Sequence, residues 1–476
     1  MLSQNTPDPR RWKALVLLCT AFFMVTLDAS IVIVALPSIA PDLGFAPSDL
    51  QWVMSAYGVT FAGLLLLGGR SADLLGRRRL FMVGTGLFAV SSFLCGLAWS
   101  DTALIAARAL QGVSAAIMAP TALSILSSTF REGSERNTAL GFWGASGGVG
   151  GTAGWLIGGP VTSGLGWEWI FFINIPVAAV LVALSPRLLA ESRGTARGGF
   201  DVAGAATITA ALGLLTYAVA EAPTAGWLSG QTLGILGLAV VLIAAFAGIE
   251  SRSASPLVPL RILRSRTLVG GNLVLLVVGM LAFGVPFVLT QYAQEVLGYS
   301  PVRFGISFTV VPVGAIVGSI ASQRTVDRIG YRGVVCAGLL LMGAASVLLT
   351  RVSVDGSYVK DLLPALLLLG PGIGAVFVAG SIATLAGVSE EETGLASGLN
   401  NTSFQFGAAV GVAVLSTVAV SEREGHGGLV ALTDSFQAAF ATSIAFAAAG
   451  LIVALALLGR RSRAARLATA TPATEQ

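Results

Sequence analysis

The sequence predicts an all-α membrane protein with fourteen membrane-spanning helices and both termini in the cytoplasm. Three observations support this prediction. Of the 476 residues, 55% are hydrophobic and only 11% are charged, whereas a soluble domain carries about 25% charged residues. The apolar residues form continuous runs of roughly 20 residues, which is the length a helix needs to cross a bilayer. The basic residues collect in alternate loops between these runs.

The continuous apolar runs favour helices over the strands of a membrane barrel, in which hydrophobicity alternates from residue to residue. The first run is too long for a cleaved signal peptide, so we expect it to be a span. The fourteen expected spans cover residues 14–36, 51–69, 80–99, 102–126, 138–163, 168–185, 202–220, 231–249, 268–291, 303–322, 333–350, 361–386, 395–420 and 436–458.

The basic residues predict the orientation of the chain. Of the 28 Lys and Arg residues, 23 fall in one set of loops, four fall in the other set, and Arg108 lies inside a span. Because loops rich in Lys and Arg stay in the cytoplasm, this asymmetry places both termini there and favours an even number of spans. The net charge of +4 gathers on no single face, so we expect no nucleic-acid partner.

Residues that carry enzymatic or metal chemistry are scarce. Cys19, Cys95 and Cys336 stand far apart inside apolar runs, and the single histidine, His426, lies in a loop. This spacing indicates neither a disulfide framework nor a metal site. The phosphate-binding pattern Gly-x-x-x-x-Gly-Lys-[Ser/Thr] is also missing from the sequence. We therefore expect no enzyme, no metal and no cofactor.

A short loop pattern occurs twice, as Asp-x-x-Gly followed by basic residues. The first copy follows the second span and comprises Gly69, Asp73, Gly76, Arg77 and Arg78. The second copy follows the tenth span and comprises Asp327, Gly330 and Arg332. Two such loops in corresponding positions predict two homologous halves, and transporters are often built from repeats of this kind.

The expected organisation has five segments. They are a cytoplasmic N-terminus (1–13), an N-terminal six-helix half (14–190), two extra helices with their linkers (191–266), a C-terminal six-helix half (267–458) and a basic, disordered cytoplasmic tail (459–476). The loop after the second span resembles the signature of the major facilitator superfamily, Gly-x-x-x-Asp-x-x-Gly-Arg-[Arg/Lys].

Three further stretches are similar to the fourteen-helix branch of drug:proton antiporters in that superfamily. Leu27–Pro37 is close to Leu-Asp-x-[Thr/Ser]-Ile-Val-Asn-Val-Ala-Leu-Pro, and Arg108–Gly112 matches Arg-x-x-Gln-Gly. Trp167–Pro176 is close to Trp-Arg-Trp-Ile-Phe-Phe-Ile-Asn-x-Pro. The resemblance covers residues 10–460. It implies the major facilitator fold, with two extra central helices between two six-helix halves, and proton-coupled drug export.

Two positions depart from the pattern of that branch. Ile33 stands where the branch usually has Asn, and Trp155 stands where its fifth helix usually has Pro. The glycines of the helix-5 motif, Gly154, Gly158 and Gly159, are present. Small residues of this kind allow membrane helices to pack closely. The missing proline leaves the antiport part of the expectation open.

Asp28 and Arg108 are the ionisable residues placed deepest in the membrane. A charged side chain at the centre of a spanning helix costs about 2.5–3.5 kcal/mol, so it marks an ion pathway or pairs with another group. The functional interpretation is that Asp28 binds and releases the coupling proton while Arg108 tunes it or orders a water. The structural interpretation is a buried salt bridge. Asp73 is expected to act as a latch that pairs with arginines or a helix end on the cytoplasmic side.

Eight aromatic and amide side chains are candidates for a substrate cavity, although each could equally pack between helices. They are Tyr57, Trp143, Asn174, Phe283, Gln291, Asn401, Phe404 and Gln405. The leading hypothesis is a monomer in the bacterial inner membrane that exports amphipathic drugs or antibiotics in exchange for protons, by alternating access. The alternative is a proton-coupled or passive carrier of one metabolite, including a self-produced antibiotic.

Overall fold

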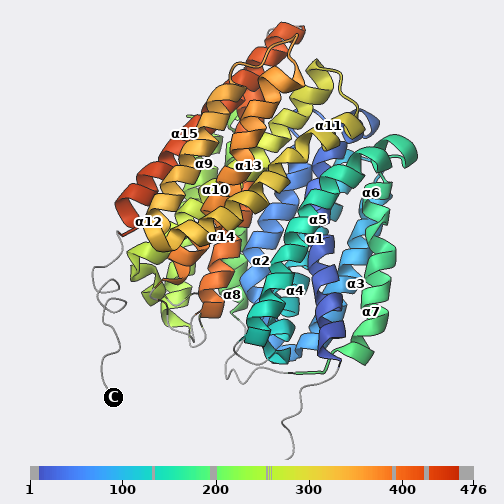
Figure 1. Cartoon of the computed structure of the whole chain (residues 1–476), viewed down its shortest axis with the longest axis vertical. Coiled ribbons are helices and arrows are strands. Elements are labelled where there is room, and N and C mark those ends of the chain that lie inside the picture. The colour runs from blue at the N-terminus through green and yellow to red at the C-terminus, as the bar shows by residue number, and fades with distance from the viewer. Residues whose placement is uncertain are drawn as a thin grey trace, which may run out of the picture.

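A computed structural model describes residues 10–459 except 131–133, 193–200, 254, 255, 257, 259, 387, 389–392 and 423–427. All regular structure in these residues is helical, and the helices form one elongated bundle (Figure 1). The predicted all-α architecture is therefore confirmed. Most of the predicted terminal segments, 1–13 and 459–476, lies outside the described residues.

Seven helices make up the N half. They are α1 (Arg11–Asp42), α2 (Trp52–Leu75), α3 (Arg77–Gly96), α4 (Asp101–Thr129), α5 (Ser134–Leu165), α6 (Trp169–Phe172) and α7 (Asn174–Leu188). Two helices follow, α8 (Val202–Ala225) and α9 (Gly230–Arg252). The C half contains η1 (Leu260–Arg264), α10 (Arg266–Gln291), η2 (Tyr292–Val296), α11 (Pro301–Phe308), α12 (Val310–Leu349), η3 (Tyr358–Leu362), α13 (Leu363–Leu385), α14 (Thr393–Ser421) and α15 (Leu429–Leu457).

Ten helical segments of the described chain are long and apolar enough to cross a membrane, and two shorter apolar stretches, Trp52–Leu65 and Ala203–Val219, add to them. One of the ten, Pro301–Leu349, contains two of the predicted spans in a single helical run. That run is interrupted at Gly330, whose backbone leaves the helical region. The glycine-rich α5 is not among the ten, since glycine adds little hydropathy.

The two copies of the loop pattern share a backbone feature. Gly76, between α2 and α3, has a φ of 108°, and Gly330, at the bend of α12, has a φ of 76°. Only glycine adopts such angles without strain, because it has no Cβ. Equivalent glycine turns in the two halves agree with the predicted internal repeat.

The extra pair α8–α9 packs along one side of the bundle, where α8 contacts both α2 of the N half and α14 of the C half (Figure 1). The contact with α2 is close, because a Cβ on Gly63 would lie 2.6 Å from Thr209 Oγ1. The contact with α14 includes a hydrogen bond of 3.4 Å from Thr417 Oγ1 to the carbonyl of Val219. The extra pair therefore touches both halves.

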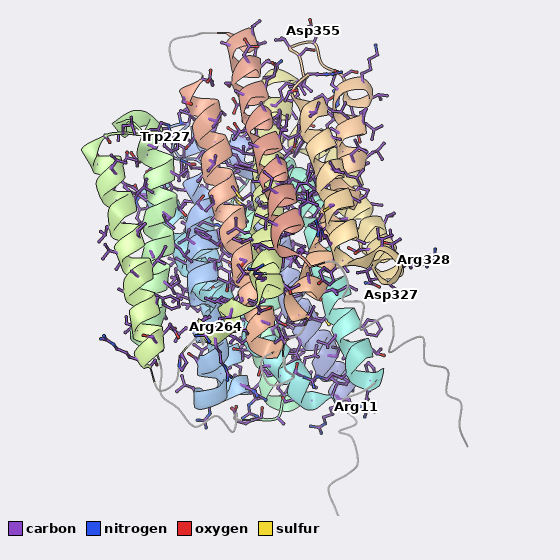
Figure 2. All side chains as sticks on the ribbon, turned by 90° about the vertical axis from the view of Figure 1, so that its left-hand side faces the viewer. Arg11, Trp227, Arg264, Asp327, Arg328 and Asp355 are labelled. Carbon is purple, nitrogen blue, oxygen red and sulfur yellow. The ribbon has the colours of Figure 1, made fainter. Side chains whose placement is uncertain are left out.

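The two ends of the bundle differ in charge. Arg11 and Arg264 lie toward one end, whereas Trp227 and Asp355 lie toward the other (Figure 2). We call the first the basic end and the second the far end. At the basic end, Arg10 donates to the carbonyl of Arg187 and Arg11 pairs with Glu135. These contacts tie the start of α1 to α5 and to the end of α7.

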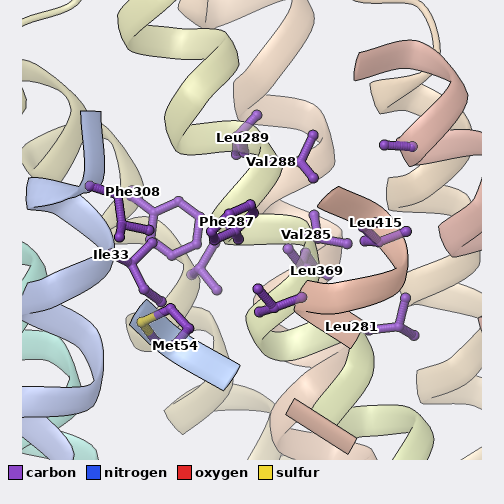
Figure 3. Packing of buried hydrophobic residues seen from close by; sticks show 14 of the residues in the cluster. Ile33, Met54, Leu281, Val285, Phe287, Val288, Leu289, Phe308, Leu369 and Leu415 are labelled. Atoms are coloured by element: carbon purple, nitrogen blue, oxygen red, sulfur yellow. The ribbon is translucent and has the colours of Figure 1, made fainter. Parts of the chain in front are cut away.

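The largest apolar core joins the two halves. Ile33 of α1 and Met54 of α2 lie beside Phe287 of α10 and Phe308 of α11 (Figure 3). All four side chains are buried. Gln294 strengthens the contact by donating to the carbonyl of Val34 over 3.0 Å. The halves are thus joined through α1, α2, α10 and α11.

Candidate functional site

The two charges predicted deep in the membrane meet inside the N half. Arg108 Nη1 on α4 donates to Asp28 Oδ2 on α1 over 2.7 Å. Both side chains have an exposed fraction of 0%. A charge-assisted bond of this length is strong, and both charges have lost their hydration. Each buried charge is therefore stable only while its partner is present, because removing either partner leaves an uncompensated buried charge.

Three neutral side chains surround the carboxylate of Asp28. Its Oδ1 accepts hydrogen bonds from Gln111 Nε2 and Asn174 Nδ2, each at 2.9 Å. The same two amides also donate to Ser92 Oγ, at 2.8 and 3.4 Å. Asp28 is consequently held by one cation and two amide donors, all of them buried.

Arg108 is held by three further contacts. Its Nε donates to the carbonyl of Val53 over 3.0 Å, and its Nη1 also donates to Gln111 Oε1. The guanidinium carbon lies 4.4 Å from the ring centre of Tyr57, where a cation and an aromatic face attract each other. Among the described residues, however, neither Arg108 Nη2 nor the hydroxyl of Tyr57 has a hydrogen-bond partner.

In a purely structural salt bridge or hydrogen-bond network, the buried polar atoms usually all have hydrogen-bond partners. Two atoms beside the ion pair, Arg108 Nη2 and the Tyr57 hydroxyl oxygen, depart from this rule among the described residues. A carboxylate can bind a proton, and a neighbouring guanidinium opposes this by stabilising the ionised form.

The local folds explain how these side chains meet. Arg108 and Gln111 are three residues apart on α4 and so share one helix face, while Asn174 is the first residue of α7. Gly112 allows α4 to approach α2, since a Cβ there would overlap the carbonyl of Tyr57. Of this network, our sequence interpretation gave Gln111 no role beyond its place in a motif, and it missed Ser92, whose one signal was a small polar residue inside an apolar span.

The glycine motif of α5 serves two packing contacts. Gly154 lies against Ser30 of α1, where a Cβ would overlap the hydroxyl oxygen, and Gly158 lies against Ile31. Gly159 faces the C half instead, because a Cβ there would be 2.5 Å from Cα of Val302 on α11. The motif thus packs α5 onto the helix that carries Asp28 and onto the other half.

The two departures from the branch pattern gather at one place. The ring centre of Trp155 lies 4.1 Å from that of Phe308 and 6.0 Å from that of Phe304. Ile33 also points toward Phe308 (Figure 3). Both substitutions therefore enlarge the apolar contact between the halves on the far-end side of Asp28.

The predicted latch loop lies at the basic end, but the side chain of Asp73 is outside the described part of the structure. The loop is held by Glu191, which follows α7 and which we did not predict. Glu191 Oε1 accepts from the backbone N–H of Arg78 over 3.1 Å, and its Oε2 lies 3.6 and 3.7 Å from Nε of Arg78 and Arg79. An acidic residue inside an otherwise basic loop was the available signal.

The counterpart loop in the C half does not repeat this arrangement in the described residues. Asp327 and Arg328 are exposed just before the Gly330 bend (Figure 2). Arg332 follows the bend and is half-buried. The two halves thus share the glycine turn, while the Glu191 contact belongs to the N half.

The structure divides the eight predicted cavity residues into two groups. Tyr57, Trp143 and Asn174 are buried in the N half, where Trp143 stacks on Phe22 at 4.4 Å between ring centres. The other five are half-buried and belong to the C half: Phe283, Gln291, Asn401, Phe404 and Gln405. Phe283 and Phe377 both pack edge-on against Phe404, at 5.9 and 5.2 Å.

Fold and site together describe a membrane protein made of two helical halves, with a buried ion pair inside the N half. The model of the Major Facilitator Superfamily matches residues 18–412 and again 273–475. The chain belongs to this superfamily. The second match begins inside the C half, in agreement with the internal repeat.

Curated relatives are similar along most of the chain. The puromycin resistance protein of Streptomyces alboniger is 39% identical over 96% of this chain and 93% of its own length. The cephamycin export protein of Amycolatopsis lactamdurans is 39% identical over 87% and 86%. The tetracenomycin C resistance and export protein of Streptomyces glaucescens is 34% identical over 87% and 76%.

Solved structures confirm the fold. A peptide transporter POT aligns with a TM-score of 0.69 at 17% identity, over 94% of this chain and 95% of its own. A bacterial homologue of the lysosomal transporter Spinster aligns with a TM-score of 0.66 at 17% identity, over 95% and 97%. Both support the major facilitator fold of the present chain.

Proposed function

We propose that this protein is a secondary transporter that exports amphipathic drugs or antibiotics in exchange for protons. The observation that carries the proton part is the buried Asp28–Arg108 pair, with its 2.7 Å ion contact and an unpaired guanidinium nitrogen. The export part is supported by relatives whose names refer to antibiotic resistance and export.

The proposed cycle alternates between two conformations of the halves. In the described conformation, α5 and α11 pack together on the far-end side of Asp28, through Gly159 and Trp155. We infer that this contact opens when substrate leaves and that Asp28 then takes up a proton from that side. Arg108 favours release of the proton after the halves have rearranged.

The driving force is sufficient for a useful gradient. One proton that enters across a membrane potential of about 100 mV releases about 2.3 kcal/mol. Since about 1.4 kcal/mol corresponds to a tenfold concentration ratio, one proton supports a gradient of about 40-fold for an uncharged drug. Exchange of one proton for a monovalent cationic drug moves no net charge, so only a pH difference drives it. A pH difference adds to this value.

We further propose fourteen spans with both termini in the cytoplasm of a bacterium, and a functional monomer. Three features support the number: α12 divides at Gly330, α5 has the length of a span, and the two shorter apolar stretches belong to α2 and α8. Arg11 and Arg264 lie at the same end of the bundle (Figure 2), which supports a cytoplasmic basic end.

The test is purified protein in liposomes with an imposed pH gradient and a panel of amphipathic cations and neutral antibiotics. Proton flux that one or more compounds stimulate would support the proposal, and its absence with every compound would contradict it. The three relatives described above are each named for one antibiotic, which favours the second candidate, a narrow exporter, whereas a relative named multidrug resistance protein Stp, 33% identical, favours the first. Flux with a single compound class would support that candidate.

A further inference from the structure

The hydrogen bonds that the described residues make to Asp28 all suit its ionised form. Oδ2 accepts from Arg108 Nη1, and Oδ1 accepts from Gln111 Nε2 and Asn174 Nδ2. Each of these partners is a donor, and an ionised carboxylate is purely an acceptor. A protonated Asp28 carries an O–H group instead, which needs an acceptor because the side chain is fully buried. One neighbour must therefore change from donor to acceptor when the proton arrives.

Gln111 is held in its present orientation. Its Oε1 accepts from Arg108 Nη1 and from Cys95 Sγ, the latter over 3.7 Å. If this amide turned over, its NH₂ group would face the guanidinium, and two donors would meet. A guanidinium stays protonated in proteins and offers no acceptor, so the turn is unfavourable while Arg108 stays in place. Gln111 therefore keeps donating to Asp28 in both protonation states.

The hydrogen bonds of Asn174 do not oppose such a turn. Its Nδ2 donates to Asp28 Oδ1 over 2.9 Å and to Ser92 Oγ over 3.4 Å, and neither partner is a cation. The two ends of a side-chain amide have nearly the same shape, and the terminal torsion of Asn is roughly two-fold. Turning the amide over places Oδ1 where Nδ2 now lies, with little change in packing. In that position, Oδ1 accepts from a protonated Asp28.

Ser92 suits either orientation of the Asn174 amide. A hydroxyl group both donates and accepts, and its hydrogen rotates to suit the partner. In the described state, the fully buried Ser92 Oγ accepts from Asn174 Nδ2 and, over 2.8 Å, from Gln111 Nε2. After the turn, the same hydroxyl donates to Asn174 Oδ1 and still accepts from Gln111. A serine at this place therefore satisfies both states of the site.

We propose that Asn174 is a positioning residue that stabilises both protonation states of Asp28 by turning its side-chain amide, and that Ser92 follows by rotating its hydroxyl. The proton forms an O–H bond at Oδ1 and removes the negative charge, while the guanidinium continues to donate to Oδ2. Two other titratable side chains lie at the site. Tyr57 on α2 packs against the guanidinium and Cys95 on α3 donates to the neighbouring amide; neither is hydrogen-bonded to the carboxylate in the described structure. The inference rests on the proposed role of Asp28 as the proton carrier.

The test is infrared difference spectroscopy of the full chain in liposomes, recorded as the pH is lowered. Protonation of Asp28 creates a carboxylic C=O band, which is identified by its absence in D28N. In the wild type, we expect a side-chain amide band to change at the same pH, because the turn changes the hydrogen bonds of Asn174. In N174L this amide change should be lost, and the carboxylic band should move to higher frequency, since its O–H has lost the acceptor. Drug-stimulated proton flux in N174L should fall about fivefold, because a buried group is left without its hydrogen bond.

Two adjacent serines of α3 supply a matched pair of smaller changes. S92A removes the hydroxyl that follows the amide, and should move the carboxylic band in the same direction by a smaller amount. S91A removes an equally buried hydroxyl that donates to the carbonyl of Phe88 within its own helix, and should leave the band unchanged. A carboxylic band at the same frequency in wild type, N174L and S92A would overturn this proposal and leave Asp28 as the proton carrier. Absence of the band from the wild type at every pH would overturn both.

Discussion

Replacing Asp28 by Asn should separate the two roles that the buried carboxylate can have. The side chain keeps its shape, and one oxygen still accepts from Gln111 and Asn174. The new amide nitrogen, however, faces Arg108 Nη1 at the position where the structure has a 2.7 Å ion contact. Two donors then face each other, and the guanidinium is left without its counter-charge.

The expected loss is large on both measures. Removing one partner of a buried ion pair costs about 3–5 kcal/mol, which thermal unfolding in detergent should detect. An Asn side chain cannot carry the proton, so the gradient of about 40-fold that one proton supports for an uncharged drug at about 100 mV should disappear. Drug-stimulated proton flux into liposomes, followed with an internal pH dye, should fall to the level of empty liposomes.

The double variant D28N/R108Q distinguishes stability from coupling. Removing both charges of a buried pair is often nearly neutral, so the double variant should recover at least half of the stability lost in D28N. It should not recover drug-stimulated proton flux, since it still has no titratable group at this position. Retained flux in either variant would refute the assignment of Asp28 as the proton carrier.

Three further predictions concern the α1–α5 contact, the loop at the basic end and the α5–α11 contact. G154A should destabilise the α1–α5 contact by about 1–3 kcal/mol, because its Cβ overlaps Ser30 Oγ. The matched control is G144A, whose Cβ has nothing within 4 Å. Equal unfolding temperatures of the two variants would contradict this prediction. E191Q should lose less than about 1 kcal/mol, since its ion pairs are partly exposed, but should increase protease cleavage at the basic end. W155A should raise thiol labelling of a cysteine introduced at position 302, and unchanged labelling would argue against an α5–α11 contact that opens.

The helical regions and the basic end of the bundle were predictable because they depend on local properties. The length of each apolar run and the charge of each loop are independent of what the run packs against. The loop expected between the spans 303–322 and 333–350 is only a bend at Gly330, where the backbone leaves the helical region. A single glycine with positive φ replaces the loop, and hydropathy does not reveal how short a turn will be.

The ion-pair site was predictable only in part. Asp28 and Arg108 stand out because charge is rare in spans, but Ser92 of the same site and Glu191 of the separate latch loop carry no such signal. Ser92 resembles any small residue of a membrane helix, and Glu191 resembles a solvated loop residue. The contact of Ile33 and Trp155 with Phe308 was equally unpredictable, since each is an ordinary apolar residue in the sequence and only the structure places Phe308 beside it.

The sequence by itself thus determined an all-α membrane chain with two related halves, a basic end and two deep charges. The reason is that the length of each apolar run and the positions of the charges can be read directly from the residue order. Only the tertiary structure decided which polar groups meet. Asp28 binds Arg108 and Asn174 across 80 and 146 residues, and Asp42 meets Trp167 across 125. Such contacts depend on the rotation and close approach of whole helices, which the glycines of α4 and α5 permit and which no local pattern specifies.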